Sequence, residues 1–252
     1  MNVSVDENDV EALDADPTSL VTRAFALLGA FRTQPVIGVS ELARRTGLPR
    51  TTVHRLASQL LDVGALSRVG VKYRLGPTLF ELGNLHYPPR MRETLQPFLD
   101  DLQRVTEGDV GLLELVGRDT IVLQAARARK STSTLMKLGS RMPASSCVGG
   151  QVLVAFNTSR PTRRQTEIRS SGFAVDQGAA ESDRTSIAAP VANRRGRVLG
   201  ALMVSLPTKS IGDNLNRFVN VTTTFARTLT HAGGTADIDF LALAPAKSTA
   251  TP

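Results

Sequence analysis

The sequence has little of what disulfide bonds, metal centres and membrane spans require. Its single cysteine, Cys147, excludes an internal disulfide, and its three histidines do not have the spacing of a zinc site. No apolar run approaches the roughly 20 residues of a membrane span, and no signal peptide is visible. Phosphate-binding loops, paired catalytic carboxylates and tandem repeats are also missing. These absences predict a cytoplasmic chain that uses no cofactor or metal, and they count against an enzyme.

The length and the charge distribution indicate two domains, one of them basic. A chain of 252 residues can form two modest domains, because domains commonly contain roughly 100 to 150 residues. The formal net charge of +7 would by itself also suit an acidic ligand or a membrane. However, residues 1–19 carry six acids and no Lys or Arg, whereas residues 20–76 carry nine Lys or Arg and two acids. The basic segment is therefore expected to bind an anionic partner.

A helix, a tight turn and a second helix are predicted within this basic segment. Ser40 is placed to cap a short helix that ends at Gly47. Pro49 then opens a second helix, which continues to about Gly64. Apolar residues recur along it at helical spacing, so its other side faces outward. The residues predicted to face outward, or to lie between the two sides, are Arg50, Thr51, Thr52, His54, Arg55, Ser58 and Gln59.

These outward residues have the chemistry of nucleic-acid binding. An arginine can present its planar fork to the major-groove edge of guanine, threonines can contact bases or phosphates, and a helix N-terminus favours a phosphate. For His54, a role in helix packing or as a phosphate donor is as good an interpretation as base readout. The second helix is therefore predicted to read DNA.

A hairpin is predicted after the second helix. Two short alternating segments flank Gly70 and expose Arg68, Lys72 and Arg74. Such a wing can reach flanking phosphates or a minor groove. Each of these cations, taken alone, is equally well explained as a solvated surface charge.

The remaining segments predict a second domain with one sheet flanked by helices. The predicted helix-turn-helix and wing, over 20–76, are called the reading head, and a helix over 20–31 supports it. A linker helix over 77–89 follows and is broken by the prolines at 88 and 89. The second domain covers 90–232, with a disordered acidic tail over 1–19 and a flexible tail over 233–252 at the two ends. Its predicted elements are a long helix from 90, a hairpin of 110–116 and 120–126, a loop and helix over 146–156, a basic amphipathic piece over 161–170, strands 186–192 and 197–206, and a helix over 213–231.

Two parts of the chain resemble the IclR family of bacterial transcriptional regulators. In the reading head the similar segments are 39–56 and 73–76, and in the second domain they are 173–176, 186–191 and 196–205. The resemblance implies a fold of the α/β (α+β) class. An N-terminal winged helix-turn-helix domain is joined by the linker helix to a GAF-like effector-binding domain with a central antiparallel sheet. It also implies a homodimer formed through the head, or a homotetramer, on palindromic or repeated double-stranded operator DNA.

The resemblance further implies a pocket for a small organic effector. Carried over residue by residue, the pocket is formed by Val148, Gly149, Asp176, Ser186, Met203 and Ser205. This chain departs from the family at three places. Ser186 stands where members often have cysteine, Met203 stands where acid-binding members have serine, and two glutamates that commonly follow the aspartate are absent. A thioether in place of a hydroxyl removes a donor for a carboxylate and adds apolar surface. The effector is therefore expected to be larger or less acidic than a simple keto acid. An organic acid or an aromatic metabolite would meet this expectation.

Two classes of function remain open from the sequence. The first is a ligand-responsive DNA-binding regulator without catalysis. The second is a small-molecule binding protein or an enzyme whose helix-turn-helix mediates partner contacts. Asp176 can equally cap a turn, Val148 and Gly149 suit helix packing, and Cys147 is better explained as a core residue than as a nucleophile. The salt dependence of DNA binding would separate the two classes.

Overall fold

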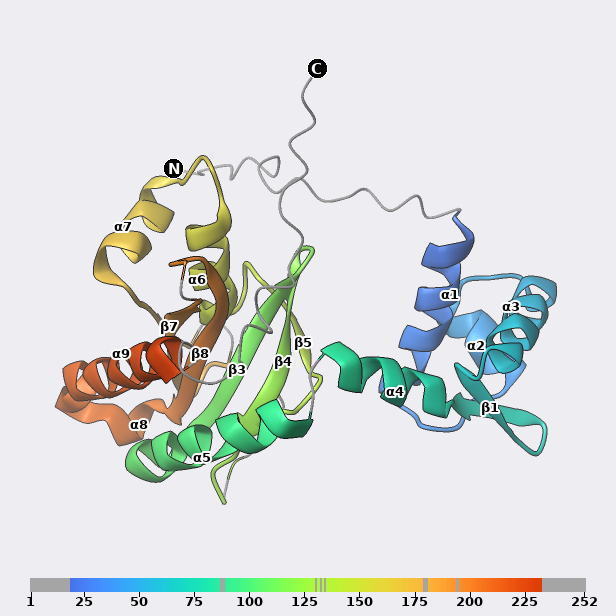
Figure 1. Ribbon diagram of the computed structural model, residues 1–252, viewed down its shortest axis with the longest axis horizontal. Helices are drawn as coiled ribbons and strands as arrows, with labels where there is room; N and C mark the ends of the chain where they lie inside the picture. The colour runs from blue at the N-terminus through green and yellow to red at the C-terminus, as the bar shows by residue number, and fades with distance from the viewer. Residues whose placement is uncertain are drawn as a thin grey trace. The chain divides into compact units, whose positions relative to one another are not determined.

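The computed structural model describes residues 19–86, 89–129, 131, 133, 135–178, 181–193 and 195–232 (Figure 1). These residues form two compact units, the first up to residue 86 and the second from residue 89. The predicted tails lie outside the described residues, except for Ser19. Pro88, at the predicted break of the linker helix, lies outside them as well.

The first unit is a small helical domain with a hairpin. Its elements are α1 (Leu20–Gly29), η1 (Ala30–Arg32), α2 (Val39–Thr46), α3 (Arg50–Asp62), β1 (Leu66–Val69), β2 (Lys72–Leu75) and α4 (Pro77–His86). The amphipathic faces of α1, α2 and α3 bury Leu27, Leu42 and Leu56 in one core cluster, to which the hairpin adds Tyr73. Ile37 extends the hairpin by a short bridge, because its N–H and C=O pair with the backbone of Tyr73 at 2.9 and 2.8 Å. This arrangement is the predicted winged helix-turn-helix.

The start of α2 differs from the prediction. Gly38, in an extended conformation with φ −89° and ψ 164°, is the N-cap, and no side chain caps the helix. Ser40 is therefore already inside the first turn, and its predicted capping role is wrong. The reason is that the bridge fixes Ile37 as a strand, so the chain turns into the helix directly after it. In the same way Pro49 is the N-cap of α3 and not its first helical residue.

Helix α4 is attached to the end of α3 through two glycines. The N–H of Gly76 donates to the carbonyl of Ala65 at 2.8 Å, and the N–H of Thr78 donates to the carbonyl of Gly64 at 3.3 Å. A Cβ atom on Gly76 would lie 2.0 Å from that Gly64 oxygen, so only glycine permits this approach. The start of α4 is thereby part of the first unit.

The second unit is a six-stranded sheet with helices on both faces (Figure 1). Its elements are α5 (Pro89–Thr106), β3 (Asp109–Val116), β4 (Asp119–Ala126), β5 (Arg141–Pro143), α6 (Val148–Asn157), α7 (Arg163–Ser171), β6 (Ala174–Gln177), β7 (Arg184–Ala192), β8 (Val198–Pro207), α8 (Thr208–Ile211), η2 (Gly212–Asn214) and α9 (Leu215–Ala232). The strand order is β5-β4-β3-β8-β7-β6, and every neighbouring pair is antiparallel. Helices α5 and α9 cover one face, and α6 covers the other with α7 beside it. The predicted fold class is confirmed.

The strands that matter most for the site begin earlier than predicted. Strand β3 starts at Asp109, one residue before the predicted segment, and β7 starts at Arg184, two residues before it. The two residues at which these strands start, Asp109 and Arg184, are charged and buried. The short edge strand β5 is absent from the prediction.

Candidate functional site

Helix α3 presents a polar surface on the side away from the core. Val53, Leu56 and Ala57 are buried, so the helical repeat turns Thr51 and Arg55 outward. The members of the predicted outward set are exposed, except for the partly buried Thr52; they are Arg50, Thr51, His54, Arg55, Ser58 and Gln59. Asp62 is also exposed at the end of the helix. Its negative charge limits an anion-binding surface to the part of α3 that precedes it.

The N-terminal end of α3 adds to this surface. Its N-cap, Pro49, makes no side-chain hydrogen bond to the helix. The backbone N–H groups of the first turn therefore lack a capping acceptor. Together with the positive end of the helix dipole and the exposed Arg50, they form a site suited to a phosphate.

The hairpin divides its three cations between two faces. Arg68 is paired with Tyr73 across the strands and lies over its ring, with 5.5 Å from Cζ to the ring centroid. Alternation along β2 places Lys72 and Arg74 on the opposite face from Tyr73. Lys72 lies near the start of α2, because a Cβ atom on Gly38 would be 3.8 Å from its Cγ. The wing therefore offers two cations on one face, beside the α2 turn that contains Ser40.

Other arginines of the first unit serve its internal structure. Glu41 accepts hydrogen bonds from Arg44 and Arg45, each at 2.6 Å to its Oε1 atom. The hydrogen bonds from Arg44 and then Arg45 lower the pKa of Glu41 to about 2. Arg45 also donates to the carbonyl of Ala30 at 2.9 Å and to the hydroxyl of Thr33 at 2.6 Å. Arg45 thus joins α2 to the end of η1.

The predicted effector residues converge on one face of the second unit's sheet. The strand register places Asp109, Ser205, Ser186 and Asp176 next to one another on β3, β8, β7 and β6. Directly opposed residues of antiparallel strands point to the same face. These four residues therefore form a polar row across the sheet.

An apolar area lies beside the polar row. Met203 precedes Ser205 by two residues, so it points to the same face. A Cβ atom on Gly149 of α6 would be 3.5 Å from the Met203 sulfur. Val148 belongs to the same buried cluster as Met203. The structure brings all six predicted residues together under α6, with polar groups toward the ends of β7 and β8 and apolar groups next to them.

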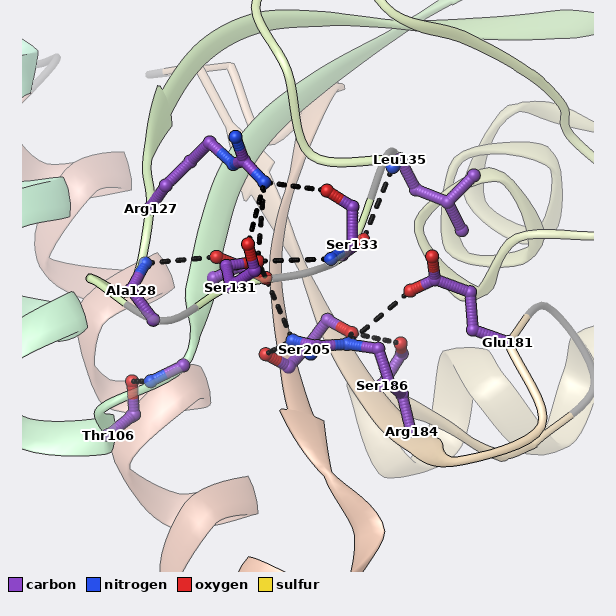
Figure 2. Close-up of polar contacts among 12 residues, drawn as sticks. Thr106, Arg127, Ala128, Ser131, Ser133, Leu135, Glu181, Arg184, Ser186 and Ser205 are labelled. Carbon is purple, nitrogen blue, oxygen red and sulfur yellow. Dashed lines mark hydrogen bonds and ion pairs between the residues drawn. The ribbon is translucent and has the colours of Figure 1, made fainter.

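Two buried charges at this face, Asp109 within the row and Arg184 beside it, are absent from the predicted site. Arg184 donates from Nε to the Ser205 hydroxyl and from Nη2 to Asp109, both at 2.9 Å (Figure 2). The Ser186 hydroxyl donates to that of Ser205 at 3.2 Å. Glu181 is a third, longer partner, with 3.4 Å between its Oε2 and the Arg184 Nε. The only sequence signal for Asp109 and Arg184 is a charge shortly before an apolar run.

Asp109 also holds the loop that follows β4. It accepts hydrogen bonds from the N–H of Ala128 at 2.9 Å and from the Ser131 hydroxyl. Arg127 closes the same loop by donating to the carbonyl of Ser133 at 2.6 Å (Figure 2). The sheet face and this loop are thus joined through one buried carboxylate.

Cys147 and the search for metal or membrane features add no further site. Cys147 is buried as the N-cap of α6, and its sulfur accepts the N–H of Gly150 at 3.2 Å. Within the described ranges, no group of three or more His, Cys, Asp or Glu side chains is arranged to hold a metal ion. None of the described helices combines the length and hydropathy that crossing a membrane requires.

Two family models match the chain in the order of its two units. The model described as the IclR helix-turn-helix domain matches residues 20–70, and the one described as Bacterial transcriptional regulator IclR C-terminal matches residues 162–231.

Individual relatives are similar over most of the chain. The HTH-type transcriptional regulator KdgR of Escherichia coli (strain K12) is 26% identical over 260 residues, which cover 90% of this chain and 98% of that protein. The HTH-type transcriptional regulator KipR of Bacillus subtilis (strain 168) is 25% identical over 212 residues, 73% of this chain and 84% of that protein.

Solved structures show the same fold. An IclR homologue from Microbacterium hydrocarbonoxydans, in complex with 4-hydroxybenzoate, has a TM-score of 0.71 and 22% identity, covering 86% of this chain and 100% of that chain. An IclR-type regulator from Silicibacter sp. TM1040 has a TM-score of 0.69 and 24% identity, covering 86% of this chain and 96% of that chain.

These similarities decide between the two classes of function that the sequence leaves open. Both units match regulators of one type, in the same order and over nearly the whole described chain. The alternative of an enzyme or binding protein that uses its helix-turn-helix for partner contacts is thereby wrong. The chain belongs to the IclR family of DNA-binding transcriptional regulators, with a C-terminal effector domain and no enzymatic activity.

Proposed function

We propose that α3 enters the major groove of operator DNA and that the wing contacts the flanking backbone. The observation that carries this proposal is the outward face of α3, where Arg50 and Arg55 have no ion pair or hydrogen bond with any described residue. Base readout is assigned to Arg55 with Thr51, and phosphate contacts to the turn around Ser40. The full proposed set is Ser40, Arg50, Thr51, Thr52, His54, Arg55, Gln59, Arg68, Lys72 and Arg74.

Fluorescence anisotropy of the full chain on its own upstream intergenic DNA, against scrambled DNA, tests this assignment. Arg55→Ala should weaken specific binding by about 1 to 3 kcal/mol if its fork contacts a guanine. Arg32→Ala is the matched control, because Arg32 is exposed outside α3 and the wing. Binding should also fall steeply with salt, as expected for several phosphate contacts. Unchanged selectivity in Arg55→Ala would remove this residue from the interface.

We further propose that a small organic effector binds on the sheet face under α6. The convergence of Val148, Gly149, Asp176, Ser186, Met203 and Ser205 supports this position. The Microbacterium homologue, whose fold is shared, was crystallised with 4-hydroxybenzoate, so an aromatic acid is a reasonable first probe. Isothermal titration with 4-hydroxybenzoate should show binding that Asp176→Ala and Met203→Ser alter, while both variants keep ligand-free operator affinity. Normal effector response in both would place the site elsewhere.

A homodimer through the first unit is the proposed assembly. Among the described residues, thirteen large apolar side chains are exposed, and ten of them lie in this unit, including Phe25 of α1 and Phe80 and Leu85 of α4. Helix α4 has no buried residue at all. Apolar surface of this extent favours a partner, and a second copy would provide two α3 helices for two half-sites of an operator. Effector binding is proposed to change the spacing of these helices. As a DNA-binding regulator, the protein is expected to act in the cytoplasm.

A further inference from the structure

Beside the polar row of the second unit lies a buried cation, Arg184, whose donors are not all matched by acceptors among the described residues. Arg184 is buried, with 6% of its side chain exposed. Its described contacts are made by Nε and Nη2, and among the described residues Nη1 has no acceptor. A buried guanidinium donor without an acceptor is unfavourable. Since a carboxylate oxygen is a strong acceptor for a guanidinium N–H, the position beside Nη1 is suited to an anionic ligand.

We propose that Arg184 binds the carboxylate of the effector through Nη1, and that Glu181, 3.4 Å from Nε, is the second carboxylate beside Arg184 when the effector is absent. The proposal rests on the effector face described above and names the chemical class that this face takes. Arg184 belongs to the same face as Ser186, which lies two residues further along β7, and it contacts Ser205 directly. The effector carboxylate would thus meet Arg184 together with the two serine hydroxyls.

The effector carboxylate is proposed to displace Glu181 from Arg184, and not Asp109. Asp109 is fully buried and accepts hydrogen bonds from Ala128, Ser131 and Arg184. Removing it would leave three donors unsatisfied. Glu181 is 22% exposed and 3.4 Å from Arg184, compared with 2.9 Å for Asp109. Because one carboxylate replaces another, the charge around Arg184 does not change when the effector binds.

The apolar area next to Arg184 defines the rest of the ligand. Met203 lies opposite Gly111 on β3 and Ala188 on β7. It is two residues, or about 7 Å, along β8 from Ser205. A Cβ atom on Gly111 would be 3.1 Å from the sulfur of Met136, so a second thioether covers this glycine. Methionine side chains adapt readily to a new neighbour. An effector bound at Arg184 would therefore place its remaining atoms against Met203, which favours a monocarboxylate with an apolar body.

The position of Arg184 alters the interpretation of Met203. Methionine at position 203, where acid-binding members have serine, removes a donor to a carboxylate, but Arg184 supplies donors from the neighbouring strand. The acid group is therefore expected to be retained in the effector, with its position moved toward Arg184.

Isothermal titration of the full chain with two matched pairs of compounds tests the proposal. The pairs are benzoate with benzamide and 4-hydroxybenzoate with 4-hydroxybenzamide, which differ in the charge of one group. The intact chain should bind at least one acid about tenfold or more tightly than its amide. Glu181→Gln should tighten the acid further and leave the amide unchanged, because only the acid competes with Glu181. Glu167→Gln, at an exposed ion pair of α7, is the control and should behave as the unmodified chain.

Arg184→Lys keeps a positive charge beside Asp109 while removing the fork, and should lose most of the preference for the acid. Its thermal unfolding is measured first, and if it does not fold, Glu181→Gln alone decides. Acids and amides that bind equally in both the unmodified chain and Glu181→Gln overturn the role of Arg184. If Ala188→Leu then abolishes that binding, the effector face itself remains supported. No binding of any of the four compounds also overturns the role of Arg184, and operator binding by the same preparations tests the DNA-binding function separately.

Discussion

At the scale of single residues, two helical glycines have opposite surroundings, one in the first turn of α6 and the other at the end of α1. A Cβ atom on Gly150 in α6 would lie 2.4 Å from the backbone of Ala144. A Cβ atom on Gly29, at the end of α1, would meet no atom within 4 Å, and its φ of −60° suits any residue. Alanine is favoured over glycine in a helix at both sites, but only at Gly29 is there space for its methyl group. Comparing the two substitutions therefore distinguishes the two effects.

Gly150→Ala should lower the free energy of unfolding by about 1 to 3 kcal/mol, because the backbone around Ala144 must move to accept the methyl group. Gly29→Ala should be neutral or stabilise by up to about 1 kcal/mol, because alanine restricts the unfolded chain and favours the helix. Thermal unfolding followed by circular dichroism compares them. An equal effect of both substitutions would show that the tight contact at α6 is not maintained in solution.

Residues whose role follows from periodicity were predictable, and residues that depend on distant contacts were not. The outward set of α3 follows from the spacing of Val53, Leu56 and Ala57 within one helix. By contrast, Arg184 and Asp109 are 75 positions apart and meet only because β8 lies between their strands. A charge at the edge of an apolar run gives no indication that it will be buried. The effector residues themselves came from family resemblance and not from the pattern.

At the scale of elements, helix α2 depends on the ionised form of Glu41. The folded pKa of about 2 lies below the ordinary value of 4.5. Glu41 therefore stabilises the fold fully above its unfolded pKa, and this contribution is lost as the pH falls from about 4.5 through about 2.

Thermal unfolding of the chain across this acidic range should show a loss of stability that Glu41→Gln reduces. The difference should shrink in high salt, because the ion pairs with Arg44 and Arg45 are at the surface. Identical pH profiles for Glu41→Gln and the unmodified chain would mean that these pairs add nothing to the helix.

Long, strongly patterned elements were predicted well, whereas short ones depended on tertiary contacts. The paired strands β3 and β4 were expected from two apolar segments around a glycine turn, and their hairpin is present. Strand β5 has three residues and exists through its pairing with β4, so no local pattern marks it. The start of α2 moved for the same reason, because Ile37 is fixed by Tyr73 and not by its neighbours.

At the scale of the whole molecule, exposed apolar side chains gather in the first unit. Phe80 is 71% exposed and Phe25 is 70% exposed, and both belong to helices that flank the reading head. If a second copy covers them, dimer formation and operator binding are linked.

If the proposed dimer forms through the first unit, Phe80→Asp should convert it into a monomer and weaken binding to a two-half-site operator more than to a single half-site. Sedimentation equilibrium at several protein concentrations measures the first effect and anisotropy the second. Leu138→Asp is the matched control, since Leu138 is 64% exposed in the second unit. Dissociation of Leu138→Asp alone would assign the interface to the effector domain.

The attachment of α4 to the end of α3 has a mechanical consequence. The close approach of Gly76 to Gly64 and the two backbone hydrogen bonds at this point leave little freedom for the first turn of α4 to swing. A rotation of the far end of α4 would therefore rotate α3 as well, because the junction between the two helices is stiff. In that case the reading head can be re-aimed as one solid piece, and its hydrophobic core need not rearrange for the operator to be released.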